Sequence, residues 1–303
     1  MALVIDARAV VKRFGRTVAL DGLELTVEQG EVHAFLGPNG AGKTTTIRIL
    51  LGMLRSDAGH LEVLGMDPWR DAMVIHRRLA YVPGDVSLWP NLTGGQTIDF
   101  IARLQGGALA GRRDQLIADF DLDPSRRCRT YSKGNRQKVA LVAALATDAD
   151  LLLLDEPTSG LDPVMEETFR QWVRTLRDEG RTVLLSSHIL SEAEALCDRV
   201  TILRGGKAVE SGRLDELRHL SATTVTATVI GQVPDLTGIP GVREVEVDGS
   251  HVSAQVATSA LAPVLAALSA AGVSSLTSQP PSLEELFLAH YGDGPRAAGG
   301  RDG

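Results

Sequence analysis

The segment that most constrains the fold of this chain is a glycine-rich run over residues 37–44, Gly-Pro-Asn-Gly-Ala-Gly-Lys-Thr. It follows a short apolar run, Val32–Leu36, and leads into a helical pattern over Thr44–Leu51. Glycines let a backbone wrap so closely that several N–H groups point at one anion, and the next helix offers its positive N-terminus. Between a strand and a helix, this run fits the phosphate-loop pattern and predicts a nucleoside triphosphate site.

Two side chains of this loop suit a triphosphate. Lys43 can supply a positive charge to the β- and γ-phosphates, and the hydroxyl of Thr44 can ligate Mg²⁺. A second candidate group follows the apolar run Leu151–Leu154, which ends in two adjacent carboxylates. Asp155 is placed to hold Mg²⁺ through its water shell, and Glu156 to orient or deprotonate the attacking water. The phosphate loop upstream disfavours the alternative, a strand that ends in two solvated acids.

Short apolar runs alternate with helical patterns from residue 3 to about residue 217. Continuous apolar runs of this length are typical of parallel strands that are buried on both faces. After Val32–Leu36 they occur at Ala80–Pro83, Leu151–Leu154, Thr182–Ser186 and Val200–Leu203. Further strands are expected at Leu3–Val10 and Leu23–Val27, which alternate in period two, and at Ala208–Glu210 after a hairpin turn. Between about residues 84 and 148 the patterns are helical. The sequence therefore predicts the α/β fold of P-loop nucleoside triphosphatases, with a helical subdomain at about 84–148.

The composition changes near residue 221. Three strand patterns and an amphipathic helix pattern follow. The strand patterns are Thr223–Ile230, Val242–Val247 and, after a hairpin turn at Asp248-Gly249, His251–Val256; the helix pattern is Ser259–Ala271. Further on, Ser282 with Glu285 three residues later is typical of a helix N-terminus. We expect an ATP-binding domain over 1–218, a small α+β domain over 221–291 and a disordered tail over 292–303, which is rich in Gly, Arg and Ala.

Composition and charge exclude several classes of protein. The formal net charge is −7 and no basic run occurs, which argues against nucleic acid as a partner, because phosphate backbones are held by Lys and Arg. No apolar stretch approaches the ~20 residues of a membrane-spanning helix, and the N-terminal residues do not resemble a signal peptide. We therefore expect any action at a membrane to depend on a partner. Cys128 and Cys197 are interpreted as core thiols.

A serine–glycine segment over residues 131–135, Tyr-Ser-Lys-Gly-Asn, precedes a helical pattern and offers a further anion site. This segment, the phosphate loop, Asp155-Glu156, the run Ser159–Asp162 and His188 occur in the order and rough spacing of the ABC transporter ATPases. From residue 3 to about 217 the chain resembles that family. A GTPase is disfavoured because no Asn-Lys-x-Asp motif for guanine is present, and a helicase or recombinase would lack the serine–glycine segment.

The resemblance assigns a role to each matching residue. ATP would be bound by Phe14, Val18, Gly37, Pro38, Asn39, Gly40, Ala41, Gly42, Lys43, Thr44 and Thr45, with Phe14 stacked on adenine. ATP held by the other subunit of a head-to-tail dimer would be contacted by Ser132, Lys133, Gly134 and Asn135. Ser159 and Asp162 would lie in the loop between the two sites, and His188 would touch the γ-phosphate. The alternatives are a core aromatic for Phe14 and a structural histidine for His188.

Two departures from the family pattern bear on coupling more than on hydrolysis. The family usually has a glutamine in the loop after the strand that contains Tyr81, where it touches Mg²⁺ and senses the transporter. Gly84 stands there in this chain and has no side chain for either role. Lys133 and Asn135 also differ from the usual Leu-Ser-Gly-Gly-Gln segment, whereas the phosphate-contacting Ser132 and Gly134 are kept.

The resemblance implies an enzyme with ATP and Mg²⁺ as cofactors, an ATPase that pairs with a second, identical subunit. It would power a separate membrane permease from the cytoplasmic face of the membrane. We expect the permease to contact the chain near Gly84–Thr93, where Trp89, Pro90 and Leu92 are apolar in a loop pattern. Pro280–Phe287 is similar to the drug-exporter branch that includes daunorubicin-resistance and tetronasin-type ATPases. That similarity implies export of a drug or antibiotic-like compound, and with it antibiotic resistance.

The sequence disfavours two other functions. A cassette ATPase of translation or DNA repair would carry two cassettes or a long coiled coil, whereas this sequence has one cassette and no heptad run. A catalytically inactive cassette that only binds ATP is disfavoured by the presence of Glu156 and His188.

Overall fold

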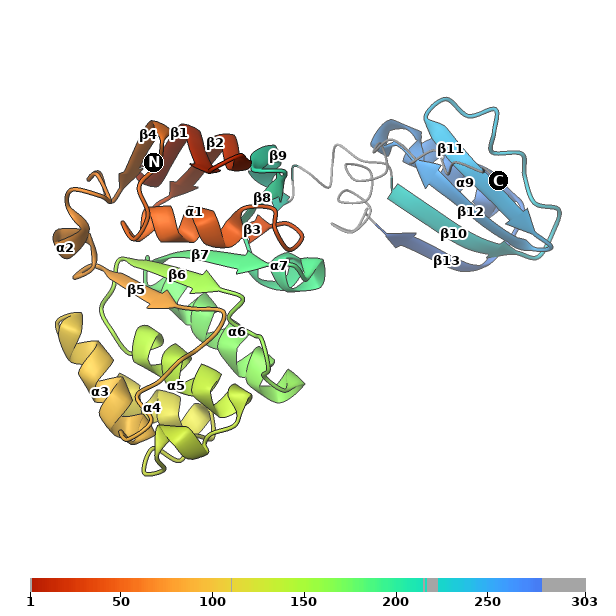
Figure 1. The fold of residues 1–303 in the computed structure, drawn as a ribbon. Coiled ribbons are helices and arrows are strands. Elements are labelled where there is room, and N and C mark those ends of the chain that lie inside the picture. Colours follow the sequence, from red (N-terminus) through yellow and green to blue (C-terminus); the bar gives the residue numbers. More distant parts are fainter. Residues whose placement is uncertain (1, 110, 215, 217–222, 280–303) are drawn as a thin grey trace, which may run out of the picture. The chain divides into compact units, whose positions relative to one another are not determined.

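The structure is a computed structural model that describes residues 2–109, 111–214, 216 and 223–279 (Figure 1). The chain divides into two compact units between Gly212 and Arg213, and each is described by itself. Of the helices in the described ranges, none is long and apolar enough to cross a bilayer.

A six-stranded sheet forms the centre of the first unit, in the order β5-β6-β7-β3-β8-β9. Its strands are β3 (Val32–Leu36), β5 (Leu79–Val82), β6 (Leu151–Asp155), β7 (Thr182–Ser187), β8 (Arg199–Arg204) and β9 (Lys207–Arg213). The pairs β5–β6, β6–β7, β7–β3 and β3–β8 are parallel. Every residue of β3, β6 and β7 is buried, which explains why these strands are largely continuous apolar runs in the sequence.

A second, antiparallel sheet has the order β2-β1-β4 and consists of β1 (Leu3–Phe14), β2 (Thr17–Glu28) and β4 (Ala58–Val63). Helix α1 (Lys43–Leu50) lies between this sheet and the six-stranded sheet (Figure 1). Ile47 of α1 belongs to the same buried cluster as Leu23 of β2, Leu153 of β6 and Leu184 of β7. This packing on both sides fixes the position of α1 and of the loop that precedes it.

Three further helices belong to the same unit: α2 (Ala72–Ile75), α6 (Pro163–Asp178) and α7 (Leu190–Leu196). The start of α6 is set by Asp162, whose carboxylate accepts hydrogen bonds from the backbone N–H groups of Val164 and Met165. The helix buries a stripe at helical spacing, formed by Met165, Phe169, Trp172, Val173 and Leu176. The helix α7 begins just after His188 and buries Leu190, Ala193 and Leu196.

The described residues between β5 and β6 form helices joined by loops, grouped together beside those two strands in Figure 1. They are α3 (Gly94–Leu104), α4 (Arg112–Asp119), a short 3₁₀ turn (Cys128–Thr130) and α5 (Lys133–Leu145). Thr93 and Gln96 form a capping box at the start of α3. At the start of α5, the Ser132 hydroxyl accepts a hydrogen bond from the backbone N–H of Asn135. The helix therefore begins several residues earlier than the apolar pattern alone suggests, and the serine–glycine segment forms its first turn.

The second unit contains a four-stranded antiparallel sheet in the order β11-β12-β10-β13. Its elements are β10 (Thr223–Val229), β11 (Val242–Asp248), β12 (His251–Val256), α9 (Leu261–Ala270) and β13 (Val273–Gln279). Val225, Val252 and Val264 belong to a buried cluster in which α9 packs on one face of the sheet. The expected helix start at Ser282, the Pro280–Phe287 segment and the tail 292–303 lie outside the described residues.

Because the two units have separate buried clusters, we predict that a chain ending at Arg218 folds by itself. Thermal unfolding followed by circular dichroism should remain one cooperative transition, and light scattering should show no aggregation. Aggregation of the truncated chain would mean instead that residues after 218 cover an apolar surface of the first unit, since exposed apolar patches promote association.

Candidate active site

Three segments that are far apart in the sequence meet at the carboxyl edge of the six-stranded sheet. The strands β6, β7 and β3 are neighbours, and their parallel register places Asp155 opposite Ser186 and Leu36 opposite Ser187. The residues that follow these strand ends are therefore brought together: Glu156 after β6, His188 after β7 and the glycine-rich loop after β3. The edge beyond the carboxyl ends of parallel strands is where open α/β sheets bind ligands.

Two of the three glycines in the loop, Gly37 and Gly42, are required by packing as well as by any anion. A Cβ atom on Gly37 would lie 2.6 Å from the Leu203 carbonyl oxygen, and one on Gly42 would lie 2.9 Å from that of Ala19. The backbone of Gly42 has a positive φ of 115°, and α1 begins at the next residue. A larger residue at either position would displace the loop from β8 or β2.

Lys43 is buried, and its ammonium group turns back into the loop. The Nζ atom donates hydrogen bonds to the carbonyl oxygens of Gly37 at 2.5 Å and Pro38 at 3.3 Å. Burial lowers the pKa of Lys43, and the nearby carboxylates of Glu156 and Asp155 oppose that change. A phosphate placed in the loop would favour the charged amine in the same way, so this side chain is suited to an anionic ligand.

Thr44 and Asp155 are side by side, as a shared metal would require. The Thr44 hydroxyl lies 3.4 Å from Asp155 Oδ2, and the side chain of Asp155 is buried. Hydroxyl and carboxylate oxygens are the donors that Mg²⁺ prefers, and magnesium sites usually add waters and substrate phosphates to one or two such ligands. Among the described residues no cluster of three or more His, Cys, Asp or Glu could hold a metal alone. The residues present fit a magnesium ion that is bound together with a nucleotide.

Glu156 has a different environment from its neighbour Asp155. The Ser186 hydroxyl donates to Asp155 Oδ1 at 2.5 Å, and the backbone N–H of Glu156 donates to the Ser186 carbonyl at 3.1 Å. Glu156 has a positive φ of 47°, a strained conformation for a non-glycine residue that these contacts help to maintain. Its Oε1 atom lies 3.2 Å from Nδ1 of His188, and both side chains are partly exposed. One carboxylate is therefore buried and fixed, while the other remains accessible to water.

The serine–glycine turn at the start of α5 packs against a loop of the same chain. Lys133 Nζ donates to the Ser159 hydroxyl at 2.9 Å. A Cβ atom on Gly134 would lie 2.5 Å from the Gly160 carbonyl oxygen, so the two backbones are in direct contact. Ser132 is exposed and is used locally as the helix cap. Two residues of the expected signature, Lys133 and Gly134, therefore support the loop that contains Ser159, and Asp162 at the end of that loop caps α6.

Two other predicted residues, Phe14 and Val18, lie at the turn between β1 and β2. Phe14 ends β1 with half of its surface exposed, and the Lys12 ammonium lies 5.6 Å from its ring centroid. Val18 is also exposed, which leaves both residues accessible to a flat ligand. In the described part of the chain, no hydrogen bond or ion pair joins Phe14 to Lys43 or Glu156.

The structure adds two features that the sequence did not indicate. The first is the position of Gly84, where a Cβ atom would lie 3.2 Å from the Asp155 carbonyl oxygen and 3.7 Å from Asp155 Cγ. The loop backbone at Gly84 therefore packs directly on Asp155, the candidate metal ligand. The second feature is Ser186, a buried hydroxyl that contacts both acidic residues at the end of β6. Its signal in the sequence is a polar residue at the end of the apolar run Thr182–Leu185, which is ambiguous without the neighbouring strand.

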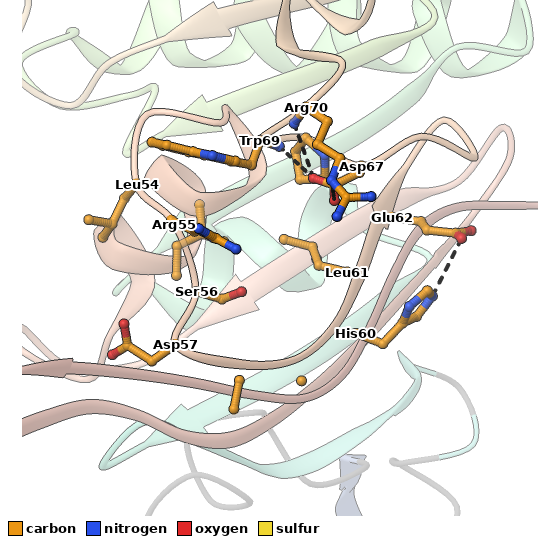
Figure 2. Close-up of a pocket in the computed structure, with 14 residues that line it drawn as sticks. Leu54, Arg55, Ser56, Asp57, His60, Leu61, Glu62, Asp67, Trp69 and Arg70 are labelled. Atoms are coloured by element: carbon orange, nitrogen blue, oxygen red, sulfur yellow. Dashed lines mark hydrogen bonds and ion pairs between the residues drawn. The ribbon is translucent and has the colours of Figure 1, made fainter.

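A separate groove of about 460 Å³ lies beside β4 and does not include these residues. Figure 2 shows Trp69, Arg70 and Asp67 on one side of it and His60 and Glu62 on another. His60 Nε2 is 3.6 Å from Glu62 Oε1, and Arg70 Nε forms an ion pair with Asp67 Oδ2 at 3.6 Å within the groove. None of the predicted ATP-binding residues lines it.

Comparisons with known proteins cover most of the chain. Residues 20–159 match the ABC transporter family, and residues 212–291 match the C-terminal domain of DrrA1-3-like ATP-binding proteins. Daunorubicin resistance ATP-binding protein DrrA3 of Streptomyces coeruleorubidus is 39% identical over 310 residues, covering 97% of both chains. Nod factor export ATP-binding protein I of Cupriavidus pinatubonensis is 32% identical, covering 95% of this chain and 90% of its own.

Solved structures agree with this fold. The ATP-binding subunit of an ABC transporter superposes with a TM-score of 0.68 at 30% identity, covering 72% of this chain and 92% of its own. A dimeric ATP-binding cassette in a post-hydrolysis state with ADP and phosphate gives a TM-score of 0.63 at 23% identity, covering 69% of this chain and 98% of its own.

The contact between Gly134 and Gly160 gives a test that needs no ligand. Because a Cβ atom at position 134 would overlap the Gly160 carbonyl, we predict that Gly134→Ala destabilises the chain by about 1–3 kcal/mol. Denaturant unfolding with and without the substitution measures the difference. Gly238→Ala is the control, because a Cβ atom there meets nothing within 4 Å. Equal stability of the Gly134→Ala and original chains would contradict the close backbone packing.

Proposed function

This chain belongs to the ATP-binding proteins of ABC transporters, and we propose that it drives export of a drug or antibiotic-like compound through a separate membrane permease. As a member of this family it is an ATPase. The observation that carries the export proposal is the agreement of both parts of the chain with one branch. The DrrA1-3-like domain matches residues 212–291, and identity to a daunorubicin resistance protein extends over 97% of the chain.

In the proposed site, Gly37–Thr45 surround the phosphates and Lys43 provides the positive charge. Support comes from the buried position of Lys43 and from the close backbone packing that keeps the loop in shape. Thr44 and Asp155 would hold Mg²⁺, which when bound neutralises charge on the phosphates. Phe14 and Val18 would receive the adenine, since both are exposed at the β1–β2 turn.

We assign water activation to Glu156. Its carboxylate is partly exposed, whereas Asp155 is buried and hydrogen-bonded by Ser186, so the two acids can serve different purposes. The Glu156 carboxylate would accept a proton from the attacking water or orient it. His188, 3.2 Å away, would restrain that carboxylate and contact the γ-phosphate.

The dimer that we propose is a head-to-tail pair of identical chains with two ATP molecules between them. Ser132, Lys133, Gly134 and Asn135 would contact the ATP of the other copy. Exposure of Ser132 and Lys133 at a helix N-terminus supports this assignment. Residues 1–218 would bind and hydrolyse ATP, and residues 221–291 would act in subunit association or regulation.

The permease would lie against the loop Gly84–Thr93, with the ATPase on the cytoplasmic face of the membrane. Trp89 in this loop packs edge-on against Phe100 of α3, with 5.1 Å between ring centroids. The two rings are 48% and 44% exposed, so they form an aromatic patch available to a partner. Because Gly84 in the same loop packs on Asp155, movement of the loop would reach the metal ligand directly.

The role of Glu156 predicts a specific kinetic result. Glu156→Gln keeps the shape of the side chain but removes the base, so ATP hydrolysis should slow by roughly 10²–10⁴-fold while ATP still binds. Sedimentation with Mg-ATP should then show a stable dimer. Glu166→Gln, on the first turn of α6, is the matched control and should hydrolyse ATP normally. Near-normal turnover in Glu156→Gln would remove this residue from the catalytic role.

The aromatic patch predicts a separation of coupling from hydrolysis. Trp89→Ala should leave basal hydrolysis within about twofold, because the ring is absent from the contacts of the candidate site, and reduce stimulation by the permease. The assay compares turnover of the ATPase alone with turnover in membranes that contain the permease. Met73→Ala, which removes an apolar side chain that is 77% exposed on α2 of the first unit, is the control. Undiminished stimulation of Trp89→Ala would place the permease contact on another surface.

A further inference from the structure

A single carboxylate on α7 connects the segments that contain the two candidate catalytic residues. Glu192 lies in the first turn of α7. Its Oε1 atom accepts a hydrogen bond from the Thr158 hydroxyl at 2.6 Å, and its Oε2 atom accepts one from the Ser187 hydroxyl at 2.8 Å. Thr158 follows Glu156 by two residues, and Ser187 directly precedes His188. Glu192 therefore joins the loop after β6 to the end of β7 immediately beside the Glu156–His188 contact.

The proton count shows why a carboxylate is needed at this position. A hydroxyl group has one proton to donate, and that of Thr158 is directed at Glu192. Ser187 Oγ has two acceptors within reach, and Glu192 Oε2 at 2.8 Å is closer than the Ile189 carbonyl oxygen at 3.3 Å. Ser187 in turn accepts a hydrogen bond from the backbone N–H of Ile189 at 2.9 Å, which turns the chain just after His188. An ionised carboxylate is acceptor-only and can receive two donors at once, one on each oxygen.

The residues held in this way are not fixed by burial. The side chain of His188 is 53% exposed and that of Glu156 is 30% exposed, so the packing of neighbours restricts neither one completely. Glu156 also has a positive φ, which the surrounding structure must maintain. On the far side of the same loop, Gln137 Nε2 donates to the Pro157 carbonyl at 2.9 Å. The loop after Glu156 is thus held by α5 through Gln137 and by α7 through Glu192.

We propose that Glu192 is a positioning residue for ATP hydrolysis, which sets the distance between Glu156 and His188 by anchoring Thr158 and Ser187. This proposal rests on the roles assigned above to Glu156 and His188. In the part of the chain that the structure describes, Glu192 forms no hydrogen bond or ion pair with Lys43, Thr44 or Asp155, so it would act on the rate of hydrolysis and leave ATP binding unchanged. A displacement of about 1 Å at a catalytic group can cost about 100-fold in rate.

The test measures single-turnover hydrolysis, ATP affinity and thermal stability of the full chain. Glu192→Ala should lower the hydrolysis rate about 10- to 100-fold with ATP affinity unchanged, and the loss of two hydrogen bonds should lower the thermal midpoint by only a few degrees. Glu192→Gln keeps one acceptor oxygen and should retain an intermediate rate. Thr158→Val, which removes one of the two hydroxyls at nearly constant volume, should reproduce part of the loss. Glu194→Ala removes the same charge from the same helix and should hydrolyse ATP at the original rate.

A double substitution distinguishes positioning from a general structural role. If Glu192 acts through the Glu156–His188 contact, Glu192→Ala should cause little further loss in a His188→Ala chain. Additive losses, loss of the folded state or an original rate in Glu192→Ala would each overturn the proposal. Full activity of Glu156→Gln and His188→Ala would instead overturn the catalytic assignments on which it rests. If those two variants are inactive while Glu192→Ala is normal, the positioning role alone is wrong.

Discussion

The parallel pairing of β6 with β7, which ends with Asp155 opposite Ser186, is the constraint on which the candidate site depends. Through this pairing one buried hydroxyl contacts the acid that would hold the metal and the backbone of the acid that would activate water. His188 directly follows β7, and its Nδ1 atom lies 3.2 Å from Glu156 Oε1. A shift of one residue in the register would reverse the faces of these side chains and separate them.

Close backbone contacts connect this edge of the sheet to the parts expected to meet other molecules. Gly84 packs on Asp155, and Gly134 packs on the Gly160 carbonyl in the loop that follows Glu156. Neither contact leaves room for a side chain without displacement, so movement on one side is transmitted to the other by contact. In a transporter ATPase this arrangement would let a permease at one loop and a second subunit at another both influence the hydrolytic residues.

The family, the P-loop α/β fold and the ATPase activity predicted from the sequence are confirmed by the comparisons. These predictions succeeded because strands that are buried on both faces have continuous apolar sequences, and because phosphate loops need glycines at fixed spacing. Two strands were not predicted, Ala58–Val63 and Val273–Gln279. Each is an edge strand that mixes polar and apolar residues. The first pairs with β1 and the second with β10, and pairing with a distant strand cannot be predicted from a local sequence pattern.

The sequence alone determined which chemical groups the chain has and in which order: Lys43 after glycines, two acids after an apolar run, a histidine after another. Only the tertiary structure decided which of them meet and by what distance, because strands β3, β6 and β7 are adjacent in the sheet but far apart in the chain. It also decided that Lys133 supports Ser159 within its own chain and that Glu192 bridges Thr158 and Ser187. Contacts of this kind depend on the folded backbone, since a single hydrogen bond between distant residues leaves no periodic trace in a sequence.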